Sequence, residues 1–220
     1  NNPREIPEEN IHSDENYARE IMQLFSVGLY ELNQDGSRKT DSLGNWIPTY
    51  DQKDIKELAK VFTGLGVGDV IENPWTDQPY FGLDIYIADM TKPMIMYEEW
   101  HQPGSKTMLD GYVIPEGQTG MQDIRDAVHQ LFLHPNVGPF IGKQLIQRLV
   151  TSNPTPEYIS RVAAVFADNG QGQRGDMGAV VKAILLDPEA RTCAALEDQA
   201  FGKLREPFAR YTHFTKALPM

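Results

Sequence analysis

The chain has 220 residues and a formal net charge of −11, and 40% of its residues are hydrophobic. This composition supplies a core and excludes an intrinsically disordered chain. The acidic balance argues against a nucleic-acid partner and against docking on anionic membranes. No apolar run reaches the length of a membrane-crossing helix, so we expect no membrane span.

Several classes of site have no sequence signature in this chain. Cys193 is the single cysteine, which excludes an intramolecular disulfide and a Cys-rich zinc site. The histidines lack zinc-binding spacing, and there is no serine-hydrolase elbow, dinucleotide fingerprint or Walker loop. We therefore predict no metal and no cofactor, with a metal centre of His101 and carboxylates as the alternative.

Residues 13–28 predict an amphipathic helix with polar groups beside its buried face. The apolar positions at helical spacing are Tyr17, Ile21, Leu24, Phe25 and Gly28. In one interpretation Glu20 is a general acid or base that Arg19 and Asn16 orient. In the other interpretation these three residues form a structural network around a buried Arg–Glu pair.

The next segments predict a hairpin and a second helix. Asp35-Gly36 is a turn signal within residues 29–50, so we expect a small β-hairpin with a long polar tip. Asp35, Asp41 and Asn45 do not match calcium-loop spacing, and this favours a solvated turn over a calcium site. Residues 52–64 predict a helix that Asp51 caps and Gly64 ends.

Residues 65–118 are rich in glycine and proline and predict a long ordered loop, or flap. Short strands are expected at 84–88 and 94–97. A long loop inside a compact domain is usually functional or a packing flap. Its aromatic residues are suited to stacking on sugar rings or to forming the flap's own core. They are Trp75, Tyr80, Phe81, Tyr86, Tyr97 and Trp100.

The remainder of the chain predicts helices over 119–133, 137–150, 155–170, 176–187 and 197–216. Thr119 opens the first of these helices with a capping box, and His134-Pro135 ends it. Pro207 is expected to kink or restart the last helix. The fold class is therefore mainly α, a helical bundle with a small β-hairpin and a long ordered loop region. We expect residues 1–220 to form a single helical domain.

Two further clusters are candidate binding sites. His101 and Lys106 lie in a glycine-containing loop that could bind a sulfate, phosphate or carboxylate through backbone N–H groups and the lysine. The alternative is a loop pinned to the helices, with His101 hydrogen-bonded to backbone. Arg205 and Glu206 precede Pro207 and either complete a polar pocket with the first helix or tether the terminal helix.

The chain resembles the bacterial family called domain of unknown function 1800 (DUF1800). The motifs that carry the resemblance are Glu15-Asn16-Tyr17-Ala18-Arg19-Glu20, Phe62-Thr63-Gly64, His101 with Gly104-Ser105-Lys106-Thr107, His134-Pro135, Phe140-Ile141-Gly142-Lys143, Leu185-Leu186-Asp187-Pro188 and Lys203-Leu204-Arg205-Glu206-Pro207. One position departs from the family pattern, since Gln102 stands where an acidic residue usually follows the histidine.

The resemblance implies a mostly helical, exported bacterial protein, periplasmic or extracellular. It also implies a genomic partner, a sulfatase-like exported protein, and hence a role in the cell envelope. Because residues 1–7 are typical of an interdomain loop, we expect the chain to be the C-terminal portion of a longer member.

Two functions are consistent with these observations. The first is a binding or assembly protein that acts with a partner and exposes an apolar or aromatic patch on the 65–118 loop. The second is a hydrolase-type enzyme on a polysaccharide or another anionic polymer. In the second, Glu20 or His101 is the acid or base, and Lys106, Arg19 and Arg205 hold the anion. The hydrolase requires these five side chains to meet in one cleft.

Overall fold

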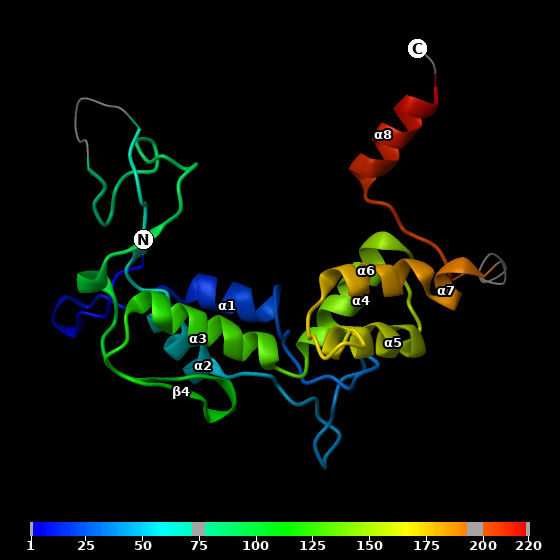
Figure 1. Cartoon of the computed structure of the whole chain (residues 1–220), viewed down its shortest axis with the longest axis horizontal. Coiled ribbons are helices and arrows are strands. Elements are labelled where there is room, and N and C mark those ends of the chain that lie inside the picture. Colours follow the sequence, from blue (N-terminus) through cyan, green and yellow to red (C-terminus); the bar gives the residue numbers. More distant parts are fainter. Residues whose placement is uncertain (1, 72–77, 193–199, 219–220) are drawn as a thin grey trace. The chain divides into compact units, whose positions relative to one another are not determined.

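The computed structural model describes residues 2–71, 78–192 and 200–218. The described part is mainly α, with eight α-helices and two small antiparallel pairs of strands (Figure 1). The predicted fold class is thereby confirmed. The chain divides into two compact units, the first formed by residues 1–31 and 47–134 and the second by residues 32–46 and 135–220. The single domain expected over residues 1–220 stays a prediction.

Three helices form the core of the first unit: α1 (Glu15–Gln23), α2 (Gln52–Val61) and α3 (Gly120–Leu133). Helix α2 lies between the other two in the packing, because it contacts both α1 and α3. Asp51 caps α2 in a reciprocal box with Asp54, so the cap expected from the sequence is confirmed. The buried apolar side chains of the three helices are Ala18, Met22, Ile55, Leu58, Ala59, Val61, Ala127 and Leu131.

The buried face of α1 is not the face that the sequence predicted. Helix α1 packs against α2, and it buries Ala18 and Met22, which are one turn apart. Tyr17 and Phe25, which we expected inside, are 57% and 68% exposed. The prediction was wrong by one helical position, because a small alanine lets the two helices approach where a tyrosine would hold them apart. Tyr17 instead lies edge-on against the ring of Phe62.

Two short strand pairs lie inside the predicted loop of residues 65–118. Strand β1 (Leu65–Gly66) pairs with β2 (Ile95–Met96), and β3 (Lys106–Thr107) pairs with β4 (Val113–Ile114), both antiparallel. The strand expected at 94–97 is confirmed by β2. The strand expected at 84–88 is wrong, since that stretch contributes a single bridge from Ala88 to Val70. One-turn 3-10 helices at Pro7–Glu9, Glu98–Trp100 and Leu109–Gly111 complete the unit.

The predicted hairpin at residues 29–50 is reduced to isolated antiparallel bridges. They join Tyr30 to Pro48, Leu32 to Arg38, and Thr40 to Trp46. Two polar turns, at residues 33–37 and 41–45, separate the bridging residues. Asp35 accepts hydrogen bonds from Ser37, and Asp41 accepts them from Leu43 and Asn45. Each carboxylate therefore closes its own turn, and this supports the predicted solvated turn.

The second unit contains α4 (Val137–Leu149), α5 (Pro156–Ala167), α6 (Met177–Leu186), α7 (Pro188–Arg191) and α8 (Pro207–Ala217). Helices α4, α5 and α6 contact one another around a core that includes Ile146, Tyr158, Ile159, Val162, Phe166, Val180 and Ile184. The predicted ends of α3, α4 and α6 are confirmed. Helix α8 begins at Pro207, and residues 200–206 are not helical, so the helix expected over 197–216 is wrong in its first part. Residues 197–199, Cys193 and Trp75 lie outside the described residues.

One ion pair joins α5 to the corner between α6 and α7. The Arg161 guanidinium binds both oxygens of Asp187, at 2.7 and 2.8 Å, and Asp187 also caps α7. Burial raises the pKa of Tyr158 to about 12, and its hydroxyl donates to the backbone oxygen of Ile184. The Arg161–Asp187 pair and the Tyr158–Ile184 hydrogen bond hold the C-terminal end of α6 in place. Pro188 follows Asp187 directly, as the first residue of α7.

Gly64 lies in the short connection between α2 and β1, and a side chain does not fit at this position. Its φ is +79°, and a Cβ atom would lie 2.8 Å from the backbone nitrogen of His101 and 2.8 Å from the oxygen of Tyr97. The backbone N–H of Tyr97 donates to the Gly64 oxygen at 2.9 Å. Residues 97–101 are thus held directly against the end of α2.

We predict that Gly64→Ala destabilises the protein more than Gly44→Ala does. Both glycines have a positive φ, and an alanine there costs ~1–2 kcal/mol. A Cβ at residue 44 meets nothing within 4 Å, whereas one at residue 64 clashes with backbone, which adds about 1–3 kcal/mol. Urea unfolding of both variants measures the difference, and equal losses would contradict the close approach.

Candidate functional site

His101 follows the 3-10 helix at residues 98–100 and is only 6% exposed. Its Nδ1 lies 2.9 Å from the backbone oxygen of Thr63, and its Nε2 lies 3.1 Å from Oδ2 of Asp123. Each ring nitrogen therefore faces a hydrogen-bond acceptor. The ring therefore joins the end of α2 to α3.

Asp123 is the centre of the site. It lies in the first turn of α3, where the helix dipole favours a negative charge, and it is 2% exposed. Oδ2 accepts from Lys106 Nζ at 2.5 Å as well as from His101, and Oδ1 accepts from Gln118 Nε2 at 3.1 Å. Burial raises the pKa of Asp123, but the hydrogen bonds from these three residues outweigh burial and hold it below its ordinary value of 3.8.

Lys106 brings a second buried charge to the site from β3. It is 2% exposed, and its ammonium donates to Asp123 and, at 3.1 Å, to the backbone oxygen of Gly104. A lysine is almost never buried to this extent without a partner, because removing an ammonium from water costs several kcal/mol. The two charges therefore depend on each other.

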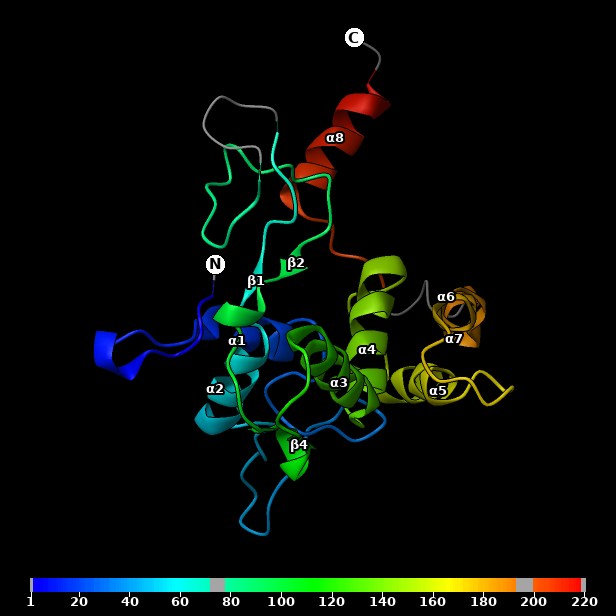
Figure 2. The same cartoon turned by 60° about the vertical axis from the view of Figure 1, so that its left-hand side comes forward.

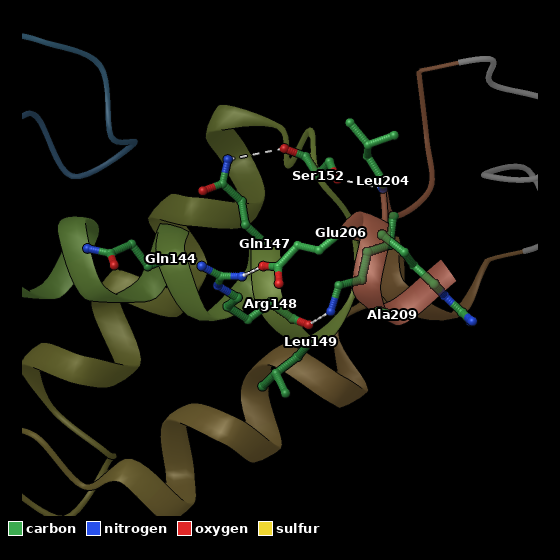
Figure 3. Close-up of a pocket in the computed structure, with 10 residues that line it drawn as sticks. Gln144, Gln147, Arg148, Leu149, Ser152, Leu204, Glu206 and Ala209 are labelled. Carbon is green, nitrogen blue, oxygen red and sulfur yellow. Dashed lines mark hydrogen bonds and ion pairs between the residues drawn. The ribbon is translucent and has the colours of Figure 1, made fainter. Parts of the chain in front are cut away.

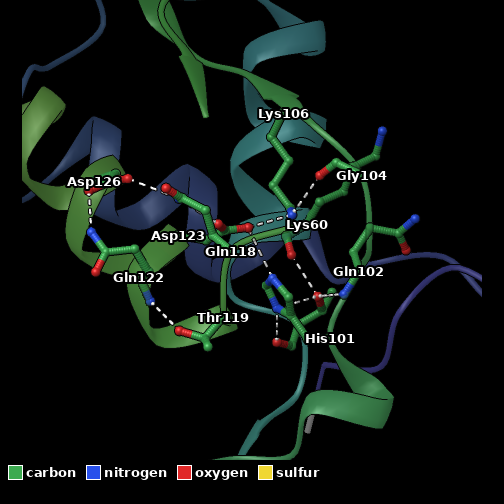
Figure 4. Close-up of polar contacts among 12 residues, drawn as sticks. Lys60, His101, Gln102, Gly104, Lys106, Gln118, Thr119, Gln122, Asp123 and Asp126 are labelled. Atoms are coloured by element: carbon green, nitrogen blue, oxygen red, sulfur yellow. Dashed lines mark hydrogen bonds and ion pairs between the residues drawn. The ribbon is translucent and has the colours of Figure 1, made fainter. Parts of the chain in front are cut away.

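A second layer of hydrogen bonds pins the loop that carries His101. The Thr63 hydroxyl donates to the Lys60 oxygen at 2.6 Å and accepts from the Gln102 backbone at 2.7 Å. The Gln102 side chain accepts from the Glu5 backbone at 2.8 Å. Figure 4 shows the contacts of His101, Lys106 and Asp123, and that of the Gln102 backbone, converging from α2, the loop and α3. We call His101, Lys106, Asp123, Thr63 and Gln118 the polar clasp.

The outer side of the clasp continues along α3. Gln118 also donates to Asp126 at 3.0 Å, and Gln122 donates to the other oxygen of Asp126 at 2.8 Å. A cavity of about 120 Å³ borders the clasp at Gly104 and Gly117. It is below the usual size of a small-molecule site. The side chains of His101, Lys106 and Gln118 beside it already bind Asp123, and these contacts support a structural junction.

The structure brings His101 and Lys106 together, as the sequence predicted, but through a residue that the sequence analysis missed. Asp123 contacts both His101 and Lys106. The signal was available, because Asp123, Ala127 and Leu131 recur every four residues along the buried face of α3. An acid in that row indicates a buried partner. The interpretation of a loop pinned to the helices is supported by the contact of His101 with the Thr63 backbone.

The predicted pair of Arg19 with Glu20 is wrong. The guanidinium of Arg19 lies 3.3 Å from the carboxylate of Glu15, one turn earlier on α1. It also donates to the side-chain oxygen of Gln52 at 3.4 Å. Adjacent residues on a helix point in different directions, so Arg19 and Glu20 cannot meet as expected. Glu20 and Asn16 are exposed. None of the contacts in the described part of the first unit joins this group to the polar clasp.

Arg205 lies in the second unit, in the segment before α8, and it is exposed. Its neighbour Glu206 binds Arg148 of α4 at 2.5 Å, and Lys203 donates to the backbone oxygen of Arg148. These contacts support the predicted tether of the terminal helix. The hydrolase needed the five side chains to meet in one cleft, and within the first unit Arg19 and Glu20 lie apart from the clasp.

The comparisons with known proteins give one match. The sequence model of the family described as "Protein of unknown function (DUF1800)" matches residues 2–219, which is nearly the whole chain. No curated protein and no solved structure matches the chain. Over residues 2–71, 78–192 and 200–218, no group of three potential metal ligands from His, Cys, Asp or Glu occurs. No helix of the described part is long and apolar enough to cross a membrane.

We predict that charge removal at the clasp is strongly non-additive. Asp123→Asn leaves Lys106 buried and unpaired, and Lys106→Met leaves the carboxylate without its closest cation, so each costs about 3–5 kcal/mol. The double variant Lys106→Met/Asp123→Asn buries neither charge and should lose much less than the sum. Urea unfolding of the four proteins gives the coupling. Asp126→Asn, on the half-buried outer side, is the control and should change little.

We also predict an acid-dependent loss of stability that originates at Asp123. Its pKa is lower in the folded than in the unfolded chain, so as pH falls the unfolded chain takes up a proton first. The stabilisation is complete above the ordinary value of 3.8 and is lost as pH falls through the folded value. The double variant without both charges should show a shallower fall in unfolding free energy between pH 5 and pH 3. Parallel curves would contradict the assignment.

Proposed function

We propose that this chain, which belongs to the DUF1800 family of proteins of unknown function, is an envelope-associated binding or assembly protein that acts with an exported partner. The periplasm or the extracellular space is its proposed location, and a sulfatase-like exported protein is the first candidate partner. One observation carries the binding role, namely the exposed apolar side chains in residues 78–95, which we call the projecting segment.

The projecting segment exposes large apolar residues to solvent. Figure 2 shows it extending beyond β1 and β2, away from α1 and α2. Tyr86 is 83% exposed and Met90 is 74% exposed. The other exposed apolar residues in the segment are Tyr80, Ile85, Met94 and Ile95. Exposed apolar side chains gathered in one segment are typical of a surface that a partner covers.

These side chains are exposed on a backbone that is held in place. Leu83 is buried, and the Phe81 ring stacks on Trp100 with ring centroids 5.0 Å apart. The backbone N–H of Asp89 donates to the Asp69 oxygen at 3.0 Å. Phe81 and Trp100 therefore serve as the flap's own core, whereas Tyr86 points to solvent. A partner that binds such a surface need not order the segment first.

Charge and composition indicate the partner's chemistry. The projecting segment carries two acidic side chains, Asp84 and Asp89, and one basic side chain, Lys92. Two further exposed acids, Glu98 and Glu99, follow it. Methionine adapts its shape to irregular apolar surfaces, and Met90 and Met94 are both exposed. We therefore propose a protein partner whose binding surface has an apolar centre and a basic rim.

The hydrolase alternative draws less support from the geometry. An acid or base must reach the proton that it transfers, but His101 is 6% exposed and both of its ring nitrogens contact acceptors inside the protein. Glu20 is exposed, but the arginine expected to orient it binds Glu15 instead. The binding role needs neither residue to act on a substrate.

The test compares partner retention by three proteins. The double variant Tyr86→Ser/Met90→Ser removes apolar surface without touching the core, and Leu43→Ser is the matched control because Leu43 is 84% exposed in the other unit. Tagged proteins are expressed in the source bacterium, and co-purifying envelope proteins are quantified. We expect the double variant to lose its main partner by about tenfold or more, as for residues central to an interface. Leu43→Ser should retain it.

Two results would contradict the proposal. Equal recovery of the same proteins by all three baits would show that the projecting segment is not the binding surface. Recovery of the untagged protein in the cytoplasmic fraction would contradict the envelope location. Direct titration of the purified sulfatase-like protein then tests the identity of the partner, apart from the existence of one.

A further inference from the structure

A cavity of about 830 Å³ lies in the second unit, between the last turns of α4 and the segment that leads into α8 (Figure 3). Its volume is within the range of about 300–1,000 Å³ that is usual for small-molecule sites. Gln144, Gln147 and Arg148 line it from one face of α4, where spacings of three and four residues place side chains side by side. Residues 203–206 line the opposite side.

The lining is basic in a protein that is acidic as a whole. Arg148, Lys203 and Arg205 contribute three positive charges, and Glu206 contributes one negative charge, so the formal charge of the described lining is +2. The whole chain has a formal charge of −11. The net charge of the molecule repels an anion, whereas the charge of this lining attracts one.

The backbone that presents two of these cations is fixed to the end of α4. The Ser152 N–H donates to the Gly202 oxygen at 2.9 Å, and the Leu204 N–H donates to the Ser152 hydroxyl at 2.9 Å. Lys203 and Arg205 flank Leu204 and so start from an anchored backbone. Preorganised donors bind a ligand with less loss of conformational entropy than donors on a free loop.

Most of the donor capacity in this cavity is uncommitted. Arg148 uses one terminal nitrogen for Glu206, and a guanidinium has five N–H donors. Lys203 donates one hydrogen to the Arg148 backbone oxygen and has two others. Within the described residues, the side chains of Arg205 and Gln144 make no hydrogen bond or ion pair. Ordinary tethering accounts for Glu206 and Arg148 but leaves Arg205 without a role.

We propose that this cavity binds a small organic anion that carries carboxylate and hydroxyl groups. The planar fork of Arg205 matches a carboxylate, and Lys203 and Arg148 add positive charge to the same lining. The amides of Gln144 and Gln147 can donate to and accept from hydroxyl groups, while Leu149 and Leu204 supply an apolar wall for the carbon skeleton. The site is independent of the proposed partner surface, because it uses none of the residues of the projecting segment.

Isothermal titration calorimetry at low salt tests the proposal with named probes. Citrate and D-glucuronate carry the required groups, D-glucose lacks the charge, and inorganic sulfate lacks the carbon skeleton. We expect citrate or glucuronate to bind one per chain. Arg205→Gln should weaken that binding by about tenfold or more, as expected for the loss of a charged hydrogen-bonding partner. Arg210→Gln is the matched control, since Arg210 is exposed on α8 and outside the lining.

Four results would overturn the proposal. They are no binding of any probe, binding of glucose as strong as that of glucuronate, binding of sulfate as strong as that of both organic anions, or an equal loss in Arg210→Gln and Arg205→Gln. Thermal unfolding confirms that each variant is folded before titration. Retention of the envelope partner by Arg205→Gln keeps this test separate from that of the proposed function.

Discussion

The buried ion pair of Lys106 and Asp123 is the interaction on which the first unit depends. Neither side chain has access to bulk water, so each is stable inside the protein only beside the other. Lys106 comes from the loop and Asp123 from α3, and His101 adds the end of α2 through Thr63. One carboxylate thereby fixes the relative positions of a helix, a loop and a helix end. Apolar packing alone does not select a single arrangement for the irregular loop of residues 65–118.

The same junction determines where the projecting segment begins. Gly64 and Tyr97 are joined by a backbone hydrogen bond, and His101 follows only four residues after Tyr97. The clasp therefore anchors β1 and β2 at the base of the projecting segment. The stacking of Phe81 on Trp100 then holds the segment against this base. The buried polar contacts of the clasp therefore hold the base of a segment that exposes apolar side chains.

Much of the helical structure could be predicted from the sequence, because helix signals are local. Asp51, Thr155 and Asp176 each cap the helix that the sequence assigned to them. The face of α1 could not be predicted as reliably, since periodicity allows two adjacent rows and tertiary packing selects the one with Ala18. The hairpin at 29–50 failed because its turns are closed by their own carboxylates, without a continuous ladder between strands.

The candidate site was predicted in part for a similar reason. His101 and Lys106 are close in the sequence and carry unusual chemistry in a glycine-containing loop, so they stood out. Asp123 is separated from Lys106 by 17 residues and lies in a helix whose other signals are ordinary. A contact between distant residues leaves no local pattern except an acid in an apolar row. The cavity beside α4 was hard to predict for the same reason. The sequence analysis identified Arg205 as a candidate, but Arg148 lies far from it in the sequence, and no local pattern joins the two.

The clasp also implies an order of events during folding. Thr63, His101 and Asp123 are separated by tens of residues, and closing such loops costs conformational entropy before any contact repays it. Helices α2 and α3 can form from local interactions, but the lysine and the aspartate cannot leave water until both helices and the loop are in place. The chain between α2 and α3 is therefore expected to condense last, in the step that excludes water from the ion pair. A nascent chain that ends before Asp123 would carry the projecting segment without the group that holds its base.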